Sequence, residues 1–243
     1  MAAPTLRRVA PVLLPLYEFI FPPVCFACGR SLPHAPSRVC DDCWKSIRPL
    51  NPDHPLLQET LEHLHRGGRV DSLVAPFLFE KDGTLQRLLH QVKYDGMERL
   101  AGLLGRAAGE SLRASGVAVG AAGLVPVPLH RSKLRERGYN QSEAIARGIG
   151  LVTGAPVLPR LLERRKRTAS QTHLSLEERR ENVRNAFRLS HPAPPPGQGG
   201  TLVLVDDVVT TGSTLEACAA VLKDAGVKGI VACTVAVAPR LFP

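Results

Sequence analysis

The stretch Leu202-Val-Leu-Val-Asp-Asp-Val-Val-Thr-Thr-Gly-Ser-Thr214 decides the fold of this 243-residue chain. The apolar run Thr201–Val205, which starts one residue before this stretch, predicts a strand that is buried on both faces, as strands of parallel sheets are. Two carboxylates and a turn rich in hydroxyl groups follow, and Thr214–Ala225 then predicts a helix that Gly226 ends. Lys228–Ala238 predicts the next strand, so the segment is a βαβ unit whose two strands run parallel.

The turn between this strand and its helix has the chemistry of a phosphate site. Glycine lets the backbone approach a ligand closely and adopt a positive φ. The first amides of a helix have no partner within the helix, and the helix dipole favours an anion at that end. We therefore expect Thr210, Thr211, Gly212, Ser213 and Thr214 to wrap a monophosphate group.

Asp206 and Asp207 precede the turn and would repel a phosphate unless they had another role. Ionised carboxylates accept hydrogen bonds from hydroxyl groups, so the pair together with the turn predicts a ribose 5-phosphate site. The alternative is an ordinary strand–turn–helix unit whose hydroxyl groups only cap the helix. The chain contains neither G-x-x-x-x-G-K-[ST] nor G-x-G-x-x-G, which excludes a P-loop NTPase and the usual dinucleotide motif.

Further periodic segments predict the rest of an α/β domain. We expect a strand over Val70–Glu80 and, over Gly123–Leu129, a buried strand that runs into a loop. Helices are expected over Thr84–Val92, Met97–Ala114, Ser142–Val152 and from Ser175 to about Phe187, and a Pro- and Gly-rich loop over His191–Gly200.

Four cysteines near the amino terminus have the spacing of a metal site. Cys25-x2-Cys28 and Cys40-x2-Cys43 are separated by eleven residues, which suits a closed tetrahedral site for structural Zn²⁺. The surrounding segment has few apolar residues, so metal binding would supply its folding energy. The alternatives are disulfide bonds, which need an oxidising compartment, and a redox C-x-x-C pair, which needs a thioredoxin-like βαβ unit around it. Nothing in the sequence indicates either one.

Composition divides the chain into three parts. We interpret residues 1–48 as a zinc-binding module with a leading amphipathic segment, residues 49–69 as a polar linker with about one helical turn, and residues 70–243 as the α/β domain. The apolar stretch Val9–Val24 is interrupted by Glu18 and four prolines and is too short to span a membrane. No signal-peptide cleavage pattern follows it, and we expect a cytoplasmic protein without a membrane span. The sequence leaves the oligomeric state open.

Positive charge is concentrated in the middle of the chain. The formal net charge is +9, and Ala121–Ser190 alone holds fourteen basic and six acidic residues. Such an excess favours an anionic partner such as phosphate, nucleic acid or a membrane surface, and a solvated basic face is the alternative. Aromatic residues make up only 5% of the chain, which argues against a stacking platform for single-stranded nucleic acid.

Several stretches resemble a known family. Val205–Thr214 looks like the phosphoribosyl pyrophosphate (PRPP) motif of type I phosphoribosyltransferases. Other segments resemble one branch of these enzymes, the ComF family of competence-protein F-like phosphoribosyltransferases. The longest of them is Val125–Gln141, with its Arg-Glu-Arg-Gly-Tyr-Asn-Gln run. The others are Lys93-Tyr94-x-Gly96, Arg167–Gln171, Arg180–Phe187 and the zinc module preceded by Phe21-Pro-Pro.

The resemblance implies the parallel sheet of a type I phosphoribosyltransferase, flanked by helices, and a transferase that uses PRPP and Mg²⁺. A nitrogen acceptor would displace pyrophosphate from C1 of the ribose. Asp206 and Asp207 would bind the ribose hydroxyls, and residues 210–214 would bind the 5-phosphate. The loop after the strand Gly123–Pro128 would face the diphosphate, and the residues that bind PRPP there would be Pro128, Leu129, His130, Arg131 and Lys133. The cations Arg131, Lys133, Arg135 and Arg137 lie in or just after this loop, and the catalytic residues would be Asp206, Asp207, Arg131, Arg135 and Arg137. A flexible loop that closes over the site would contain Arg167, Thr168 and Gln171.

Two other functions stay open at this point. One is the handling of nucleic acid in DNA uptake, with DNA or the uptake machinery as the partner, and the other is the sensing of PRPP without turnover. The sequence does not indicate which acceptor a transferase of this kind would use.

Overall fold

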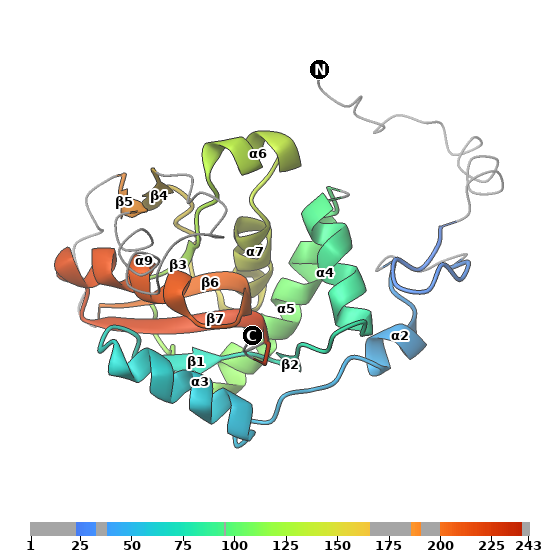
Figure 1. Cartoon of the computed structure of the whole chain (residues 1–243), viewed down its shortest axis with the longest axis horizontal. Helices are drawn as coiled ribbons and strands as arrows, with labels where there is room; N and C mark the ends of the chain where they lie inside the picture. Colours follow the sequence, from blue (N-terminus) through green and yellow to red (C-terminus); the bar gives the residue numbers. More distant parts are fainter. Residues whose placement is uncertain (1–22, 33–37, 95, 166–185, 191–199, 240–243) are drawn as a thin grey trace, which may run out of the picture.

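A parallel β-sheet forms the centre of the molecule (Figure 1). The structure is a computed structural model, and it describes residues 23–32, 38–94, 96–165, 186–190 and 200–239. In spatial order its strands are β1 (Ser72–Val74), β7 (Gly229–Val237), β6 (Thr201–Val209) and β3 (Gly123–Pro126), and β2 (Phe77–Leu78) also pairs with β7. Every pairing in this sheet is parallel. The expected parallel sheet is confirmed.

The side chains of β6 alternate between two hydrophobic cores. Val203 and Val205 lie in one core, whereas Leu202 and Leu204 lie in the other, and all four are at most 1% exposed. Successive side chains of a strand point to opposite faces, so a continuous apolar run is what a sheet covered on both faces requires.

Helices cover both faces of the sheet. The core on one face contains side chains of α4 (Thr84–Tyr94), α5 (Glu98–Ser115) and α7 (Gln141–Thr153). The core on the other face contains side chains of α3 (Pro55–Arg66), α9 (Ser213–Asp224) and a two-stranded antiparallel sheet of β4 (Leu162–Arg164) and β5 (Phe187–Leu189). Among the described helices, none is both long and apolar enough to cross a membrane.

Glycines let α5 and α7 cross with their backbones in contact. A Cβ atom built on Gly105 would lie 2.2 Å from the carbonyl oxygen of Ile145, and one built on Gly148 would lie 2.2 Å from that of Gly102. No side chain fits at either position. The crossing therefore fixes where the amino-terminal end of α7 lies relative to the sheet.

The segment that we expected to be a linker contains the twelve-residue helix α3, so that interpretation is wrong. The helix begins after His54, whose Nδ1 accepts a hydrogen bond from the amide of Leu56, with Pro55 in its first turn. Leu57 and Leu64 are buried in the core shared with α9. The helix is stable because this apolar side is packed, whereas its polar, His-rich composition suggested solvent exposure.

Other boundaries differ from the predictions for local reasons. Pro76 separates β1 from β2 inside the expected strand Val70–Glu80 because proline has no N–H to donate to a ladder. β6 continues to Val209, four residues beyond the predicted end, because Val208 and Val209 pair with β7. Phe187, the predicted end of a helix, instead begins β5, and residues 175–185 of that predicted helix lie outside the described residues.

Candidate functional site

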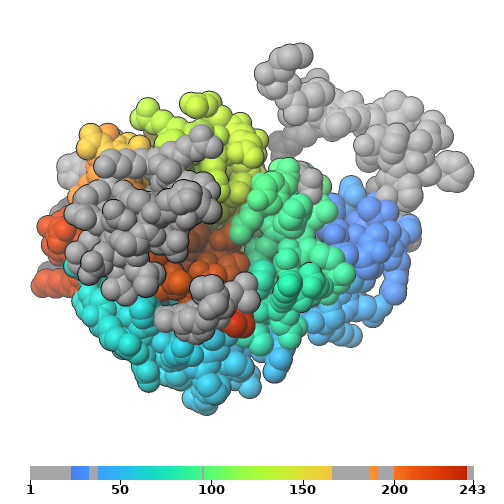
Figure 2. All heavy atoms as spheres, in the orientation of Figure 1, coloured from blue at the N-terminus to red at the C-terminus, as the bar shows by residue number. Residues whose placement is uncertain are grey.

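The carboxyl ends of β3 and β6 form a topological switch point. The two strands are neighbours in the sheet. After β3 the chain continues through α6 (Arg131–Arg137) into α7 on one face, whereas after β6 it enters α9 on the other. Ligands of open α/β sheets bind in the crevice that such a divergence creates. Figure 2 shows orange atoms of the β6–α9 region at the bottom of a hollow between α6 and α4.

The turn after β6 has the backbone that a phosphate site requires. Gly212 precedes the first residue of α9 with a φ of +74°, and Thr210 and Thr211 are exposed. The hydroxyl groups of Thr211 and Ser213 lie 3.0 Å apart. The amides of Ser213 and Thr214 begin α9, so neither has a carbonyl of an earlier helical turn to bond; that of Ser213 donates a long hydrogen bond, 3.5 Å, to Oγ1 of Thr211. The turn thus offers hydroxyl groups and backbone donors together.

The two aspartates are held by different helices. Asp206 Oδ1 accepts hydrogen bonds from the Ser142 hydroxyl and from the Asp207 amide, both at 2.9 Å. Asp207 Oδ1 accepts from the Val208 amide at 2.9 Å, and its Oδ2 lies 2.6 Å from Nζ of Lys93. Ser142 belongs to α7 and Lys93 to α4, so the position of the acid pair depends on both helices.

The environment of the acid pair disfavours two full negative charges. Burial, and after it the neighbouring charge of Asp207, raises the pKa of Asp206 to about 7. The hydrogen bonds from Asp207 and Ser142 act in the opposite direction but do not offset burial. Asp207 has its charge balanced by Lys93 instead. Near neutral pH the site therefore carries less negative charge than two free carboxylates would.

The four predicted cations were expected in or just after the loop that follows β3, and they lie just after it, on α6. α6 carries Arg131, Lys133, Arg135 and Arg137, and it has no buried residue. Among the described residues, the first three are exposed and have no ion pair. A run of alternating basic residues cannot be assigned to loop or helix by hydrophobic periodicity, because there is none to read.

The remaining predicted residues differ in how the structure places them. Pro128 is buried, Leu129 is half-buried, and His130 starts α6 by accepting a hydrogen bond from the Ser132 amide. His130 is therefore a helix-capping residue as well as a member of the predicted loop. Arg167, Thr168 and Gln171 lie outside the described residues.

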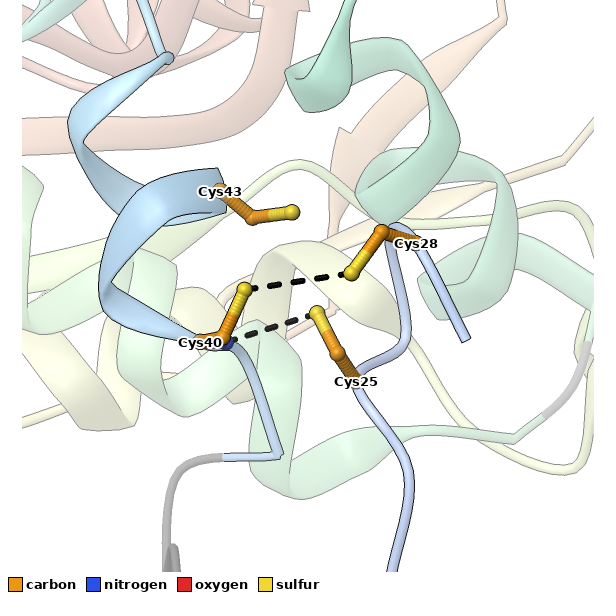
Figure 3. A group of neighbouring side chains, drawn as sticks. All are labelled: Cys25, Cys28, Cys40 and Cys43. Carbon is orange, nitrogen blue, oxygen red and sulfur yellow. Dashed lines mark hydrogen bonds between the residues drawn. The ribbon is translucent and has the colours of Figure 1, made fainter. Parts of the chain in front are cut away.

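The four cysteines gather as the spacing predicted (Figure 3). Their Sγ atoms all lie within 4.8 Å of one another, and those of Cys28 and Cys40 are 3.8 Å apart. Sulfur atoms around a tetrahedral Zn²⁺, with Zn–S bonds of about 2.3 Å, are separated by about 3.8 Å. The donor set and its spacing fit a structural zinc ion.

Backbone amides favour the thiolate form of one cysteine in this cluster, which is the form that binds a cation. Burial alone would raise the pKa of Cys25, but amide groups of Cys40, Cys28 and Ala27 lower it to about 6. Burial, and after it the other three thiols, raises the pKa of Cys43. Four thiolates this close would repel one another without a metal, so zinc binding would be coupled to proton release.

The zinc module packs against the α/β domain. Ser46 Oγ, just after α2 (Asp41–Lys45), lies 2.8 Å from Oγ1 of Thr84 at the start of α4. The ring of Trp44 meets that of Phe77 edge-on at 6.1 Å. Cys25 and Cys40 belong to the same core as α4 and α5. The module is therefore continuous with the core on that face of the sheet.

Sequence reasoning assigned no role to Lys93 or Ser142. Lys93 was noticed only in a resembling stretch, and Ser142 only as the expected start of a helix. Both reach the acid pair from elements distant in sequence, and a single sequence carries no direct signal for such contacts. The one available signal was the position of each residue at the end of an amphipathic helix.

Comparison with known families supports both parts of the chain. A model described as "Phosphoribosyl transferase domain" matches residues 151–240, which include the acid pair and the turn. A model described as "Double zinc ribbon domain" matches residues 16–55, which include all four cysteines. The predicted structural zinc and the phosphoribosyltransferase-type fold both have support from these matches.

Similar proteins point to the same family. The DNA utilization protein YhgH of Salmonella typhi is 35% identical over 142 residues, which are 57% of this chain and 60% of that protein. Competence protein F of Haemophilus influenzae is 36% identical over 44% of this chain and 46% of its own length. Competence protein ComFC of Bacillus subtilis is 29% identical over 42% of this chain and 39% of its own. The matches thus span about three fifths of these relatives or less. Together these matches support a ComF-family, phosphoribosyltransferase-like protein with an amino-terminal zinc module.

Proposed function

We propose that this protein binds PRPP with Mg²⁺ and transfers its phosphoribosyl group to a nitrogen acceptor, with release of pyrophosphate. The observation that carries the proposal is the pairing of Asp206 and Asp207 with the turn at Gly212, at the carboxyl end of one strand. Carboxylates suit the ribose hydroxyls, and the turn with the first amides of α9 suits the 5-phosphate. The acid pair lies near the carboxyl end of β6, and the turn follows directly after it.

The reaction is a displacement at C1 of the ribose. The bond from C1 to the diphosphate oxygen breaks, its electron pair leaves with pyrophosphate, and the acceptor nitrogen forms the new bond and loses a proton. Charge develops on the leaving group, so fixed cations lower the barrier. Mg²⁺, where bound, would neutralise part of the diphosphate charge. The exposed cations Arg131, Lys133 and Arg135 of α6 are the candidates from this chain.

The proposal is tested by calorimetric titration with PRPP in the presence of Mg²⁺, followed by an assay of pyrophosphate release with candidate nucleobases and amines. We expect binding by the wild type and a loss of at least about tenfold in affinity for Asp207→Asn, since a hydrogen-bonded ionic acceptor is lost. Asp224→Asn, at the exposed end of α9, removes the same charge away from the crevice and is the control. No heat above buffer at millimolar PRPP would remove the proposal.

The same experiments separate a PRPP-sensing regulator from an enzyme. A regulator would bind PRPP with the same dependence on Asp207 but release no pyrophosphate with any acceptor tested. We favour transfer because the acid pair and the exposed cations of α6 accompany each other in this chain.

A second candidate function is nucleic-acid binding. Two observations favour it: the exposed cations Arg131, Lys133 and Arg135 of α6, which have no ion pair within the described part of the chain, and the names of the relatives, which refer to DNA utilization and competence. If phosphate contacts carried such binding, DNA affinity would fall steeply between low and moderate salt. Absence of a gel shift even at low salt would end this candidate and leave the PRPP proposal intact.

A further inference from the structure

The ion pair between Lys93 and Asp207 joins two side chains that are largely shielded from solvent. Nζ of Lys93 is 2.6 Å from Oδ2 of Asp207, and the two side chains are 31% and 9% exposed. The other ion pairs of the described residues join side chains of which at least one is more than 40% exposed. Among the carboxylates in these ion pairs, the one that pairs with Lys93 is therefore the least exposed.

The backbone that carries Lys93 is anchored. The preceding residue, Val92, is fully buried, and its carbonyl oxygen accepts a hydrogen bond from the hydroxyl group of Tyr139. Tyr139 lies in the loop between α6 and α7. This hydrogen bond thus connects the end of α4 to the loop that leads from α6 to Ser142. A lysine on a free helix end would lose this fixed position.

Electrostatics explains why the acid pair needs this cation. PRPP carries several negative charges, and two adjacent carboxylates in a poorly solvated crevice would repel it. Asp206 reduces this repulsion by its hydrogen bond with Ser142 and its tendency to bind a proton. Asp207 has no such bond to a neighbouring hydroxyl among the described residues, and Lys93 balances its charge.

We propose that Lys93 is a positioning residue of the sugar phosphate site: its ammonium group neutralises Asp207 and holds the carboxylate for the ribose hydroxyls, so that a highly anionic sugar phosphate can bind beside the acid pair. The inference rests on the proposed function, and it adds α4 as a wall of the site. It also separates the two acids by role, because among the described residues only Asp207 forms an ion pair with this cation.

A double-mutant cycle tests the inference. Calorimetric titration with PRPP and Mg²⁺ is carried out on the wild type, Lys93→Met, Asp207→Asn and the double variant. We expect Lys93→Met to weaken binding by at least about tenfold in the wild-type background, since it leaves a buried charge unpaired. In the Asp207→Asn background the same change should cost less than about threefold, because no charge then needs balancing.

Two control variants complete the design. Lys93→Arg keeps the cation and should retain most of the affinity. Arg87→Met removes one positive charge from an exposed position of the same helix and should leave binding unchanged. Thermal melting of each variant identifies any that fails to fold, in which case Lys93→Gln replaces Lys93→Met.

The outcomes separate the inference from the proposed function. Failure of the wild type to bind PRPP overturns both. Normal binding by the wild type with equal losses from Lys93→Met in both backgrounds overturns the inference alone, because Lys93 would then act without Asp207. An effect of Arg87→Met as large as that of Lys93→Met would also overturn it, since general charge would then explain the loss.

Discussion

A Cβ atom built on Gly212 would lie 2.5 Å from Cδ2 of Leu64, so α3 forms the back of the turn that begins α9. Leu64 is fully buried, and Gly212 has a positive φ of +74°. The segment interpreted as a linker from its composition is therefore part of the support for the proposed phosphate site.

Replacing this glycine should destabilise the protein. We expect Gly212→Ala to lower the free energy of unfolding by about 2–4 kcal/mol, since a positive φ costs about 1 kcal/mol and overpacking against Leu64 adds about 1–3 kcal/mol. Gly138→Ala is the matched control, because Gly138 has a φ of +81° and no atom near its Cβ position. Urea denaturation measures both. Equal losses for the two variants would show that the Leu64 contact adds nothing.

The crossing of α5 and α7 provides a second prediction. Gly105→Ala would place a methyl group 2.2 Å from the backbone of Ile145, so we expect a loss of at least about 2 kcal/mol in the free energy of unfolding. Gly102→Ala in the same helix meets only one atom, at 4.0 Å, and should be neutral or slightly stabilising. Thermal melting compares the two. A Gly105→Ala variant as stable as Gly102→Ala would contradict the close crossing.

Asp206 makes stability depend on pH in an unusual direction for a carboxylate. Its pKa in the folded protein is raised to about 7, against about 3.9 in an unfolded chain. Between these values the folded state binds more protons than the unfolded state, so this group lowers stability as pH rises from about 4 to about 7.

Asp206→Asn should remove that dependence. At pH 8 we expect the variant to be more stable than the wild type by on the order of 2 kcal/mol, whereas at pH 4 the two should be similar. Urea denaturation across this range measures the difference, with Asp224→Asn at an exposed position as the control. Parallel stability curves for the wild type and Asp206→Asn would show that Asp206 ionises normally.

Removal of the metal should increase amide hydrogen exchange in α4 as well as around the cysteines. Ser46 and Trp44 contact Thr84 and Phe77, so we expect chelation to increase amide hydrogen exchange in residues 38–50 and in the first turns of α4. Exchange in β6 and β7 should stay slow. Cys40→Ser should reproduce the effect, whereas Cys218→Ser, in the opposite core, should leave α4 protected. Unchanged exchange in α4 after chelation would show that the module and the helix are independent.

The sequence predicted those parts of the fold that local patterns specify. The apolar run before Asp206 and the Thr-Thr-Gly-Ser turn identified β6, the turn and α9 because strand burial and helix initiation are local properties. The four cysteines likewise identified a metal cluster through spacing alone.

The rest depends on contacts between distant segments. The contact of Leu64 with Gly212 and that of Lys93 with Asp207 join residues far apart in the chain, and neither residue type indicates its partner. The same holds for β4 and β5, two three-residue strands that exist through pairing with each other. The role of each predicted site residue stays a prediction until binding is measured.

One short helix lies between the zinc module and the proposed sugar phosphate site. α4 has eleven residues, or about 16 Å, with the zinc module at its first turn and Lys93 near its last. Zinc content would therefore set the fraction of molecules competent to bind the anion. A preparation with too little zinc should titrate with reduced stoichiometry and near-normal affinity, so metal analysis belongs beside every binding constant measured on this protein.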